Sequence, residues 1–425
     1  MCDLGNGLVL RTLRNEVDVR TFAIFNGEMN NAREGATCAC VLDHHPFTTY
    51  SDYRIVEDTR NGKIVSTTCS FPWVVQFETI RLQAVMLEMV LTHPEYRRQG
   101  LVRRQIEFFH QDALERNADF SMIWGIPYYY RQFGYTYCLE GETAEVLPAF
   151  QVPDFNPDRA PEIRLRPAEL SDIPVLEGFY NRSMQSLDIW IPRPAAYWEY
   201  LIRWAKFPVQ VIEDNQTGVV HGYAVNVQSP QKCLVLESSM DNQQVAIAYL
   251  GMLKNQGVSN LSIAWPERGM LAQAARSLGS HALPGGQWLL RLPDAGKFLL
   301  SIKPLLEERL ARSGLQSLCL DLVVNLYHNA WQICFQQGKL VEIRRLGFMN
   351  TGMGADGGDL CIPPDAFTRL VFGFRTLDEL EDAWPDILVK PEIRWLVEVL
   401  FPRLSAHLFT PYHYWGPPEG IAIAG

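Results

Sequence analysis

The sequence predicts a mixed α/β protein of three domains. Its 425 residues suit three units at about 150 residues each. Two stretches rich in proline and glycine, residues 148–161 and 283–294, interrupt it, and proline disfavours regular structure around itself. A strand, a helix and a strand follow one another over residues 84–124, which indicates an α/β unit with parallel strands. The expected domains are residues 1–150, 158–290 and 293–425.

The composition narrows the class of protein. The chain is 47% hydrophobic and 20% charged, which is ordinary for a globular protein. No uncharged apolar run approaches the roughly 18 residues that cross a bilayer. The first residues lack the pattern of a signal peptide, because an acid stands at position 3 and the apolar run 8–10 stops at Arg11. We expect a cytoplasmic protein with no membrane span.

The charge balance disfavours one class of partner. Lysine and arginine number 38 and acidic residues 48, so the formal net charge is −10. A general nucleic-acid binder usually carries a basic surface, so we expect no nucleic-acid partner. An acidic protein can instead attract cationic substrates.

The nine cysteines do not suggest a metal site. Only Cys38 and Cys40 are close together, and strand alternation would place both thiols on one face. No second Cys/His pair at ligand spacing accompanies them. We expect reduced, mostly buried thiols and no metal.

The first segment contains the clearest secondary-structure signals. Residues 52–57 and 63–71 read as strands around a turn at Arg60-Asn61-Gly62. Residues 84–92 form a nearly continuous apolar run, interrupted only by Glu88, which suits a strand buried on both faces.

A helix and another strand follow that buried strand. The helix is expected from Tyr96 to about Asn117, and the short strand from Phe120 to Trp124. Apolar residues recur every three or four positions on one helix face: Val102, Ile106, Phe109 and Ala113.

The turn before this helix is the most informative part of the chain. Four arginines fall within residues 97–104, around Gly100. Unpaired N–H groups at a helix start bind anions, phosphate above all, and glycine lets the ligand approach the backbone. Neither a Gly-Lys-Ser/Thr loop nor a GxGxxG pattern is present. The pattern alone equally fits a basic, solvated first helical turn.

Two motifs here resemble those of a known family. Residues 90–101, Val-Leu-Thr-His-Pro-Glu-Tyr-Arg-Arg-Gln-Gly-Leu, resemble the acetyl-CoA signature Arg/Gln-x-x-Gly-x-Gly/Ala of the GNAT N-acetyltransferases. Arg97 and Gly100 match it, while Val102 replaces its last small residue. Residues 128–135, Tyr-Tyr-Tyr-Arg-Gln-Phe-Gly-Tyr, resemble the Tyr-x-x-Phe-Gly-Tyr segment of the enhanced intracellular survival (Eis) family.

The resemblance implies an architecture for the whole chain. Eis-like proteins have two tandem GNAT-like domains followed by a sterol-carrier-protein-like α+β domain, and they are often hexamers. Residues 240–245 lack the Arg-x-x-Gly loop, so we expect no cofactor site in the second domain. In the third, residues 372–380 and 400–402 are similar to family stretches.

It also implies an activity, transfer of an acetyl group from acetyl-CoA to the amine of a small-molecule or peptide acceptor. In this superfamily two parallel strands part beside the cofactor, so that backbone groups pair with the pantetheine arm and loop amides hold the pyrophosphate. The residues expected to contact acetyl-CoA are Val90, Leu91, Thr92, Arg97, Arg98, Gln99, Gly100, Leu101, Val102 and Arg103.

The family spacing selects Tyr130 as the general acid, with Tyr129 next in order. A phenol with a pKa of about 10 is protonated at neutral pH and can donate to a thiolate. On spacing alone, packing of the three tyrosines as an aromatic surface is favoured, and the family resemblance reverses that preference.

The general base stays open. Eis-like enzymes use their own C-terminal carboxylate, yet this chain runs eleven residues past Tyr414, so Gly425 serves only if the tail folds back. Glu88, His93 and a water are the alternatives.

A second function, binding of a lipid or other apolar ligand, would use the third segment. The apolar run 318–326 and the aromatic residues Tyr327, Trp331 and Phe335 would line a cavity in that case. They would otherwise form an ordinary core.

Overall fold

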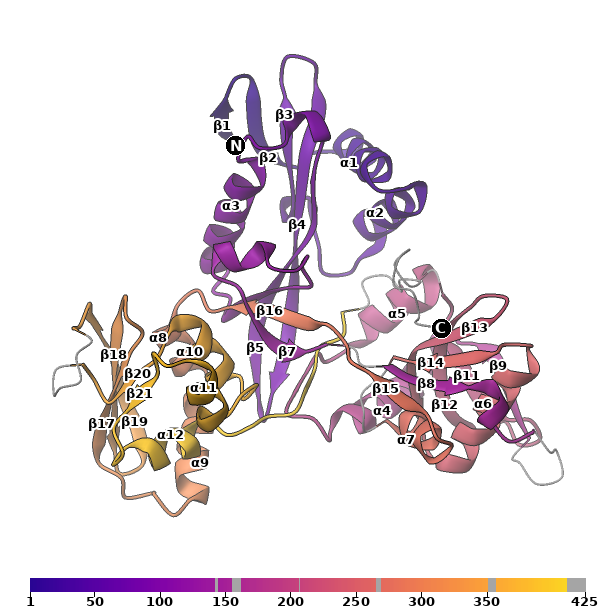
Figure 1. The fold of residues 1–425 in the computed structure, drawn as a ribbon. Coiled ribbons are helices and arrows are strands. Elements are labelled where there is room, and N and C mark those ends of the chain that lie inside the picture. The colour runs from indigo at the N-terminus through magenta and orange to yellow at the C-terminus, as the bar shows by residue number, and fades with distance from the viewer. Residues whose placement is uncertain (142–143, 155–161, 206, 265–268, 351–356, 411–425) are drawn as a thin grey trace.

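The chain folds into three lobes in the computed structural model (Figure 1). The structure describes residues 1–141, 144–154, 162–205, 207–264, 269–350 and 357–410. Each lobe contains both helices and a sheet, which confirms the predicted mixed α/β class. No helix within these ranges is long and apolar enough to cross a bilayer.

The N-terminal lobe is built on a mostly antiparallel sheet. Its strand order is β1 (Cys2–Gly5), β2 (Leu8–Thr12), β3 (Tyr53–Asp58), β4 (Lys63–Phe77), β5 (Ile80–Thr92), β6 (Phe120–Ile123), β16 (Gln287–Arg291) and β7 (Thr136–Glu140). Helices α1 (Glu16–Met29) and α2 (Ala32–His44) lie on one side, and α3 (Leu101–Glu115) lies on the other (Figure 1).

The predicted strand–helix–strand unit is present. Strands β5 and β6 pair in parallel, with α3 between them in the chain. Ala84 and Met86 belong to the core shared with α1, whereas Val85 and Leu87 pack with α3, so β5 is buried on both faces as expected. The cysteine prediction was wrong in one respect, because Cys38 and Cys40 lie on helix α2 rather than on a strand.

The second lobe repeats this plan. Its strand order is β15 (His281–Leu283), β8 (Ala144–Pro148), β14 (Asn260–Ile263), β13 (Lys232–Met240), β12 (Val220–Gln228), β11 (Gln210–Asp214) and β9 (Ile163–Pro167). Its helices are α4 (Ile173–Met184), α5 (Ala195–Trp204), α6 (Gln243–Asn255) and α7 (Met270–Ser277). Strands β13 and β14 are parallel and flank α6, just as β5 and β6 flank α3.

The two lobes exchange strands across the expected boundaries. Strand β8, which the sequence places in the first domain, pairs with β14 and β15 of the second sheet. Strand β16, which it places almost wholly in the second, inserts between β6 and β7. Cuts at residues 150 and 290 therefore do not separate the two sheets. Alternation of polar and apolar residues fixes the faces of a strand but not its neighbours.

The third lobe is an α+β unit. Its sheet runs β19 (Lys339–Gly347), β18 (Ala330–Gln336), β17 (Leu320–Asn325), β20 (Leu360–Cys361) and β21 (Leu388–Val389). Its helices are α8 (Ala295–Ser301), α9 (Lys303–Arg312), α10 (Pro364–Val371), α11 (Leu377–Ala383) and α12 (Arg394–Leu400). Leu322, Val324 and Phe335 are buried in its core. Its likeness to sterol carrier proteins stays a prediction.

The last described residues return to the first sheet. Strand β22 (Ala406–His407) pairs with β10 (Ile189–Trp190), which in turn pairs with β4. The buried indole N–H of Trp288, on β16, donates to the carbonyl oxygen of Leu408 at 2.9 Å. Short 3₁₀ helices complete the chain: η1 (Tyr50–Asp52), η2 (Pro94–Tyr96), η3 (Tyr129–Phe133), η4 (Ala149–Gln151) and η5 (Leu170–Asp172).

Candidate active site

Strands β5 and β6 diverge halfway along the first sheet. Their pairing ends at Met86 and Met122, and β5 continues alone to Thr92. A bulge against β4 accompanies the divergence, with Met89 at φ 53°. The hydroxyl of Thr67 donates to the Met89 carbonyl at 2.9 Å and holds the bulge in place. The sequence could not show this divergence, which depends on pairing rather than on composition.

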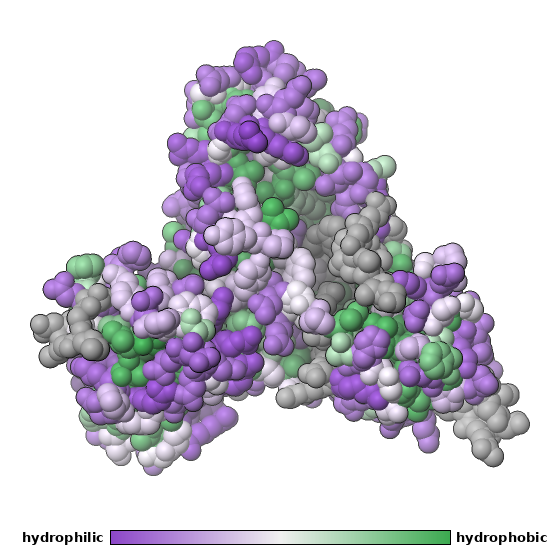
Figure 2. Space-filling view, viewed as in Figure 1, coloured by the Kyte–Doolittle hydropathy of each residue, from purple (hydrophilic) through white to green (hydrophobic). Residues whose placement is uncertain are grey.

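A cavity of about 200 Å³ opens beside the diverging strands. Figure 2 shows hydrophobic residues in the hollow of the N-terminal lobe, between α3 and the pair α1 and α2. The cavity is lined from α1, α2, β5, β6, η3 and the loop after β6 by Asn26, Asn30, Glu34, Thr37, Cys38, Leu87, Glu88, Met89, Val90, Leu91, Ile123, Trp124, Gly125, Ile126 and Tyr130.

Tyr130 projects into this cavity from η3 and is only 6% exposed. Burial raises the pKa of its phenol above the ordinary value, and the charge of Glu88 raises it further, so the phenol is protonated at neutral pH. Its hydroxyl makes no hydrogen bond with any described residue. Tyr129 does not line the cavity. Its ring makes edge-to-face contacts with the rings of Tyr130, whose centre is 5.1 Å away, and Phe133.

A glycine sets the position of the Tyr130 ring. A Cβ on Gly125 would lie 2.2 Å from Cδ2 and 2.5 Å from Cε2 of that ring, so only glycine leaves room for it. Gly125 lies two residues past the end of β6, which ties the ring to the end of the diverging strand. Sequence reasoning missed this residue, because nothing local links position 125 to position 130.

Two carboxylates, Glu34 and Glu88, flank the cavity, with the buried thiol of Cys38 near both. Burial raises the pKa of Cys38 to about 12, and the charges of Glu34 and Glu88 add to the effect. The thiol therefore stays protonated and is a poor nucleophile. The sequence analysis did not single out the residues from α1 and α2, although Asn26 and Asn30 share one helix face at i, i+4 spacing.

The loop after β5 has the geometry of an anion site. Arg98 and Gly100 adopt left-handed conformations, with φ of 64° and 77°, and Gly100 is the N-cap of α3 and makes no side-chain cap. A Cβ built on Gly100 meets nothing within 4 Å, so the space before the helix start is open. Arg97, Arg98 and Gln99 are exposed around it.

The rest of the loop is anchored to the lobe. Leu101 is buried against β2, β3 and β4, and half-buried Val102 packs on the cluster that contains Tyr130. Arg103 donates to Oε1 of Gln132 at 2.9 Å and lies 5.1 Å from the centre of the Phe133 ring. The loop and the segment that carries Tyr130 are therefore held together.

The predicted cofactor strand lies between the loop and the cavity. Val90 and Leu91 line the cavity, and Thr92 continues β5 toward the loop. His93 lies outside the cavity, where its Nδ1 accepts from the backbone N–H of Glu95. Gly425, the other predicted base, lies outside the described residues.

One cavity wall depends on the exchanged strand. The indole of Trp124 packs closely against two glycines, since a Cβ on Gly141 would lie 2.2 Å from its ring and a Cβ on Gly286 would lie 2.5 Å from it. Trp288, on β16, stands edge-on to it at 5.3 Å. Gly286 and Trp288 belong to the segment that crosses from the second lobe, so both lobes shape this cavity.

No three His, Cys, Asp or Glu side chains within the described ranges gather as metal ligands would. The polar side chains among the described residues that line the cavity are two carboxylates, two amides, a hydroxyl, a phenol, a thiol and the indole of Trp124.

Comparison with known proteins agrees with this geometry. Residues 27–138 match the model of the acetyltransferase (GNAT) domain. A search of curated protein sequences gives no match to the chain.

Solved structures share the whole fold. A GCN5-related N-acetyltransferase from Anabaena variabilis is similar with a TM-score of 0.68 at 14% identity, over 94% of this chain and 99% of that one. A probable N-acyltransferase from Enterococcus faecalis has a TM-score of 0.71 at 14% identity, over 96% of this chain and 99% of that one. Eis1 from Mycobacterium abscessus gives 0.58 at 15% identity, over 94% and 98%. At these identities the likeness establishes the fold, including that of the Eis-like proteins named in the sequence analysis.

Proposed function

This chain carries a GNAT acetyltransferase domain, and from that premise we propose that it transfers an acetyl group from acetyl-CoA to the amine of an acceptor, with Tyr130 as the general acid. One observation carries the proposal. Tyr130 and the expected cofactor strand, at Val90 and Leu91, line the same cavity where β5 and β6 part.

The residues around the loop fit the phosphates of acetyl-CoA. Open space before Gly100, the uncapped start of α3 and exposed Arg97 and Arg98 favour an anion there. We assign the pyrophosphate to residues 98–103 and the pantetheine arm to the backbone of residues 90–92. The co-substrate supplies the activated thioester, and the loop and strand hold it.

Tyr130 suits the task of a general acid. Its raised pKa keeps the proton on the phenol until a thiolate, with an ordinary pKa of about 8.5, develops beside it. The hydroxyl has no competing bond to a described residue. Contact with Gly125 holds the ring still, and that limits the entropy lost in reaching the reactive geometry.

We assign deprotonation of the acceptor to Glu88. It is the half-buried carboxylate on the cofactor strand, next to the bulge, and it lines the cavity with Tyr130. Together with Glu34 it gives the cavity a negative field, which attracts an ammonium group before the proton leaves. The sequence alone leaves Glu88, His93, the C-terminal carboxylate and water as alternatives.

The second lobe has no equivalent loop in this proposal. Helix α6 begins with Asn242, whose side chain accepts from the backbone N–H of Val245 at 2.9 Å. A side chain thus accepts a hydrogen bond from a backbone N–H at the start of α6. In the first lobe, Gly100 has no side chain that could do the same at the start of α3. We therefore propose one acetyl-CoA site for each chain.

The test compares two neighbouring tyrosines. Tyr130→Phe keeps the ring and removes the hydroxyl, so kcat should fall about 10²–10⁴-fold with little change in acetyl-CoA affinity. Tyr129→Phe makes the same chemical change outside the cavity and should leave kcat unchanged. Equal turnover in the Tyr130 variant, under conditions where chemistry limits kcat, would refute the assignment.

A further inference from the structure

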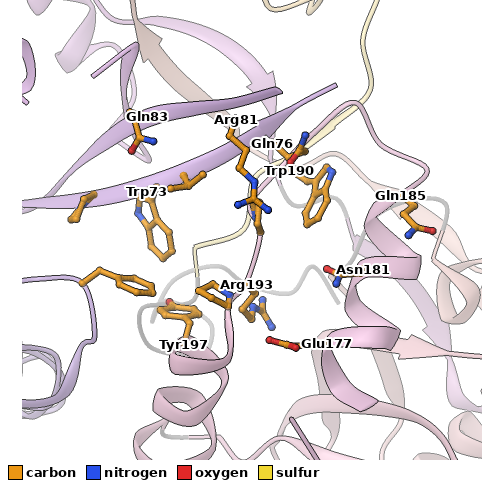
Figure 3. A pocket seen from close by; sticks show the side chains of 15 residues that line it. Trp73, Gln76, Arg81, Gln83, Glu177, Asn181, Gln185, Trp190, Arg193 and Tyr197 are labelled. Carbon is orange, nitrogen blue, oxygen red and sulfur yellow. The ribbon is translucent and has the colours of Figure 1, made fainter. Parts of the chain in front are cut away.

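A larger cavity, of about 650 Å³, lies between the first two lobes (Figure 3). It shares no lining residue with the cavity of Tyr130 and adjoins the opposite end of β4 and β5. Its walls are the ends of these strands, helix α4 and the segment from β10 into α5. The volume falls within the roughly 300–1,000 Å³ of ligand sites.

The cavity has aromatic walls. Phe47, Trp73, Trp190 and Tyr197 line it, and the rings of Trp73 and Tyr197 meet edge to face at 5.5 Å. The indole N–H of Trp73 is buried and has no hydrogen-bond partner among the described residues.

Two opposite charges face the cavity from opposite sides. Arg81 extends from β5, and Glu177 extends from α4 (Figure 3). Neither forms an ion pair with any described residue. Arg193 also lines the cavity, but its guanidinium is buried in a bidentate pair with Glu237. Amide side chains complete the wall: Gln76, Gln83, Asn181 and Gln185.

The edge of β4 is open at the same place. Strand β3 pairs with β4 as far as Cys69, and β10 pairs with it from Gln76 onward. Within the described strands, residues 70–75 therefore pair only with β5. Pro72 has no N–H to give to β5, so its backbone carbonyl faces the open edge. By the alternation of an antiparallel strand, the backbone N–H and C=O groups of Ser70 and Val74 face the same way. Such an edge accepts an added strand.

We propose that this cavity binds a short extended peptide with free termini, independently of acetyl transfer. The peptide backbone pairs with the open edge of β4, its carboxylate meets Arg81 and its ammonium meets Glu177. Residues 72–74 are the part of this edge that lines the cavity, and at 3.3 Å each they span about 10 Å, the length of an extended tripeptide. In an extended tripeptide the first and third side chains share one face, so aromatic residues there would contact Trp73 and Tyr197.

The test uses the tripeptide Phe-Ala-Phe and calorimetry without acetyl-CoA. The free peptide should bind once per chain, and blocking either terminus, by N-acetylation or C-amidation, should weaken binding about tenfold. In Arg81→Gln, C-amidation of the peptide should no longer weaken binding. In Glu177→Gln, N-acetylation of the peptide should no longer weaken binding. Arg182→Gln on α4 and Glu199→Gln on α5 remove charges that do not line the cavity, and neither should change peptide binding.

Three results would overturn the proposal. The first is that the peptide does not bind, and the second is that both blocked peptides bind as tightly as the free peptide. The third is that blocking each terminus weakens binding by the same factor in the wild type and in the Arg81 and Glu177 variants. The last result would place the peptide elsewhere, such as in the cavity of Tyr130. Because no acetyl-CoA is present, none of these results depends on the proposed transferase activity.

Discussion

Replacing Gly125 by alanine should separate the position of Tyr130 from its chemistry. The added Cβ would lie 2.2 Å from Cδ2 of the Tyr130 ring, whereas carbon atoms in contact are about 3.5 Å apart. The ring must therefore move by roughly 1.3 Å. A misplacement of about 1 Å in an active site can cost 10²-fold in rate, so kcat should fall about 10²-fold. The three atoms nearest the added Cβ all belong to the Tyr130 ring and none to the loop at Gly100, so acetyl-CoA affinity should hold.

The assay is release of the CoA thiol, with the best amine from a panel of polyamines and lysine peptides. Gly178→Ala is the matched control, because a Cβ there meets nothing within 4 Å. Crowding should also lower the free energy of unfolding by about 1–3 kcal/mol, which denaturant unfolding measures.

A double variant gives the decisive comparison. Once Tyr130→Phe has removed the hydroxyl, moving the ring should cost little more, so Gly125→Ala with Tyr130→Phe should be about as slow as Tyr130→Phe alone. Full additivity of the two losses, or an unchanged kcat in Gly125→Ala, would refute the claim that Gly125 positions the acid.

Three further outcomes follow from the structure. If Glu88 is the base, Glu88→Gln should lower kcat at least about tenfold, and deletion of residues 415–425 should not. The reverse result would make the C-terminal carboxylate the base, and an unchanged kcat in both variants would favour water as the base. Burial lowers the pKa of His45 to about 3, so below about pH 6.5 the unfolded chain binds a proton that the folded chain does not, and the free energy of unfolding should decrease as the pH falls. In unfolding titrations at pH 5–6.5, His45→Phe should reduce the slope of that decrease by up to about 1.4 kcal/mol per pH unit, and an unchanged slope would count against this explanation. Residues 1–150 alone lack β16 and should not fold to a cooperative, active domain; a stable, active fragment would show that the strand exchange is dispensable.

Local signals in the sequence predicted the site best where function depends on a short stretch of chain. Gly100 and Arg97 mark a strand-to-helix turn whose geometry is set by neighbouring residues, and the structure has that turn. The spacing of the tyrosines to Phe133, Gly134 and Tyr135 in the family motif selected Tyr130 over Tyr129, and Tyr130 is the one that lines the cavity.

Contacts distant in sequence could not be predicted in the same way. The walls from α1 and α2 reach β5 only through the folded sheet, and Gly286 holds Trp124 across 162 positions. The exchange of β8 and β16 was missed for a related reason, since a strand pattern specifies buried faces and not partners. The divergence of β5 and β6 is likewise a property of pairing.

Calorimetric titration of acetyl-CoA into the whole chain tests the central claim most directly, when wild type and Gly100→Glu are compared. The account predicts one acetyl-CoA per chain in the wild type and no measurable binding in a folded Gly100→Glu variant, because the carboxylate would occupy the open space before α3 and repel the pyrophosphate. Normal affinity in that variant, or two acetyl-CoA molecules per chain, would contradict it.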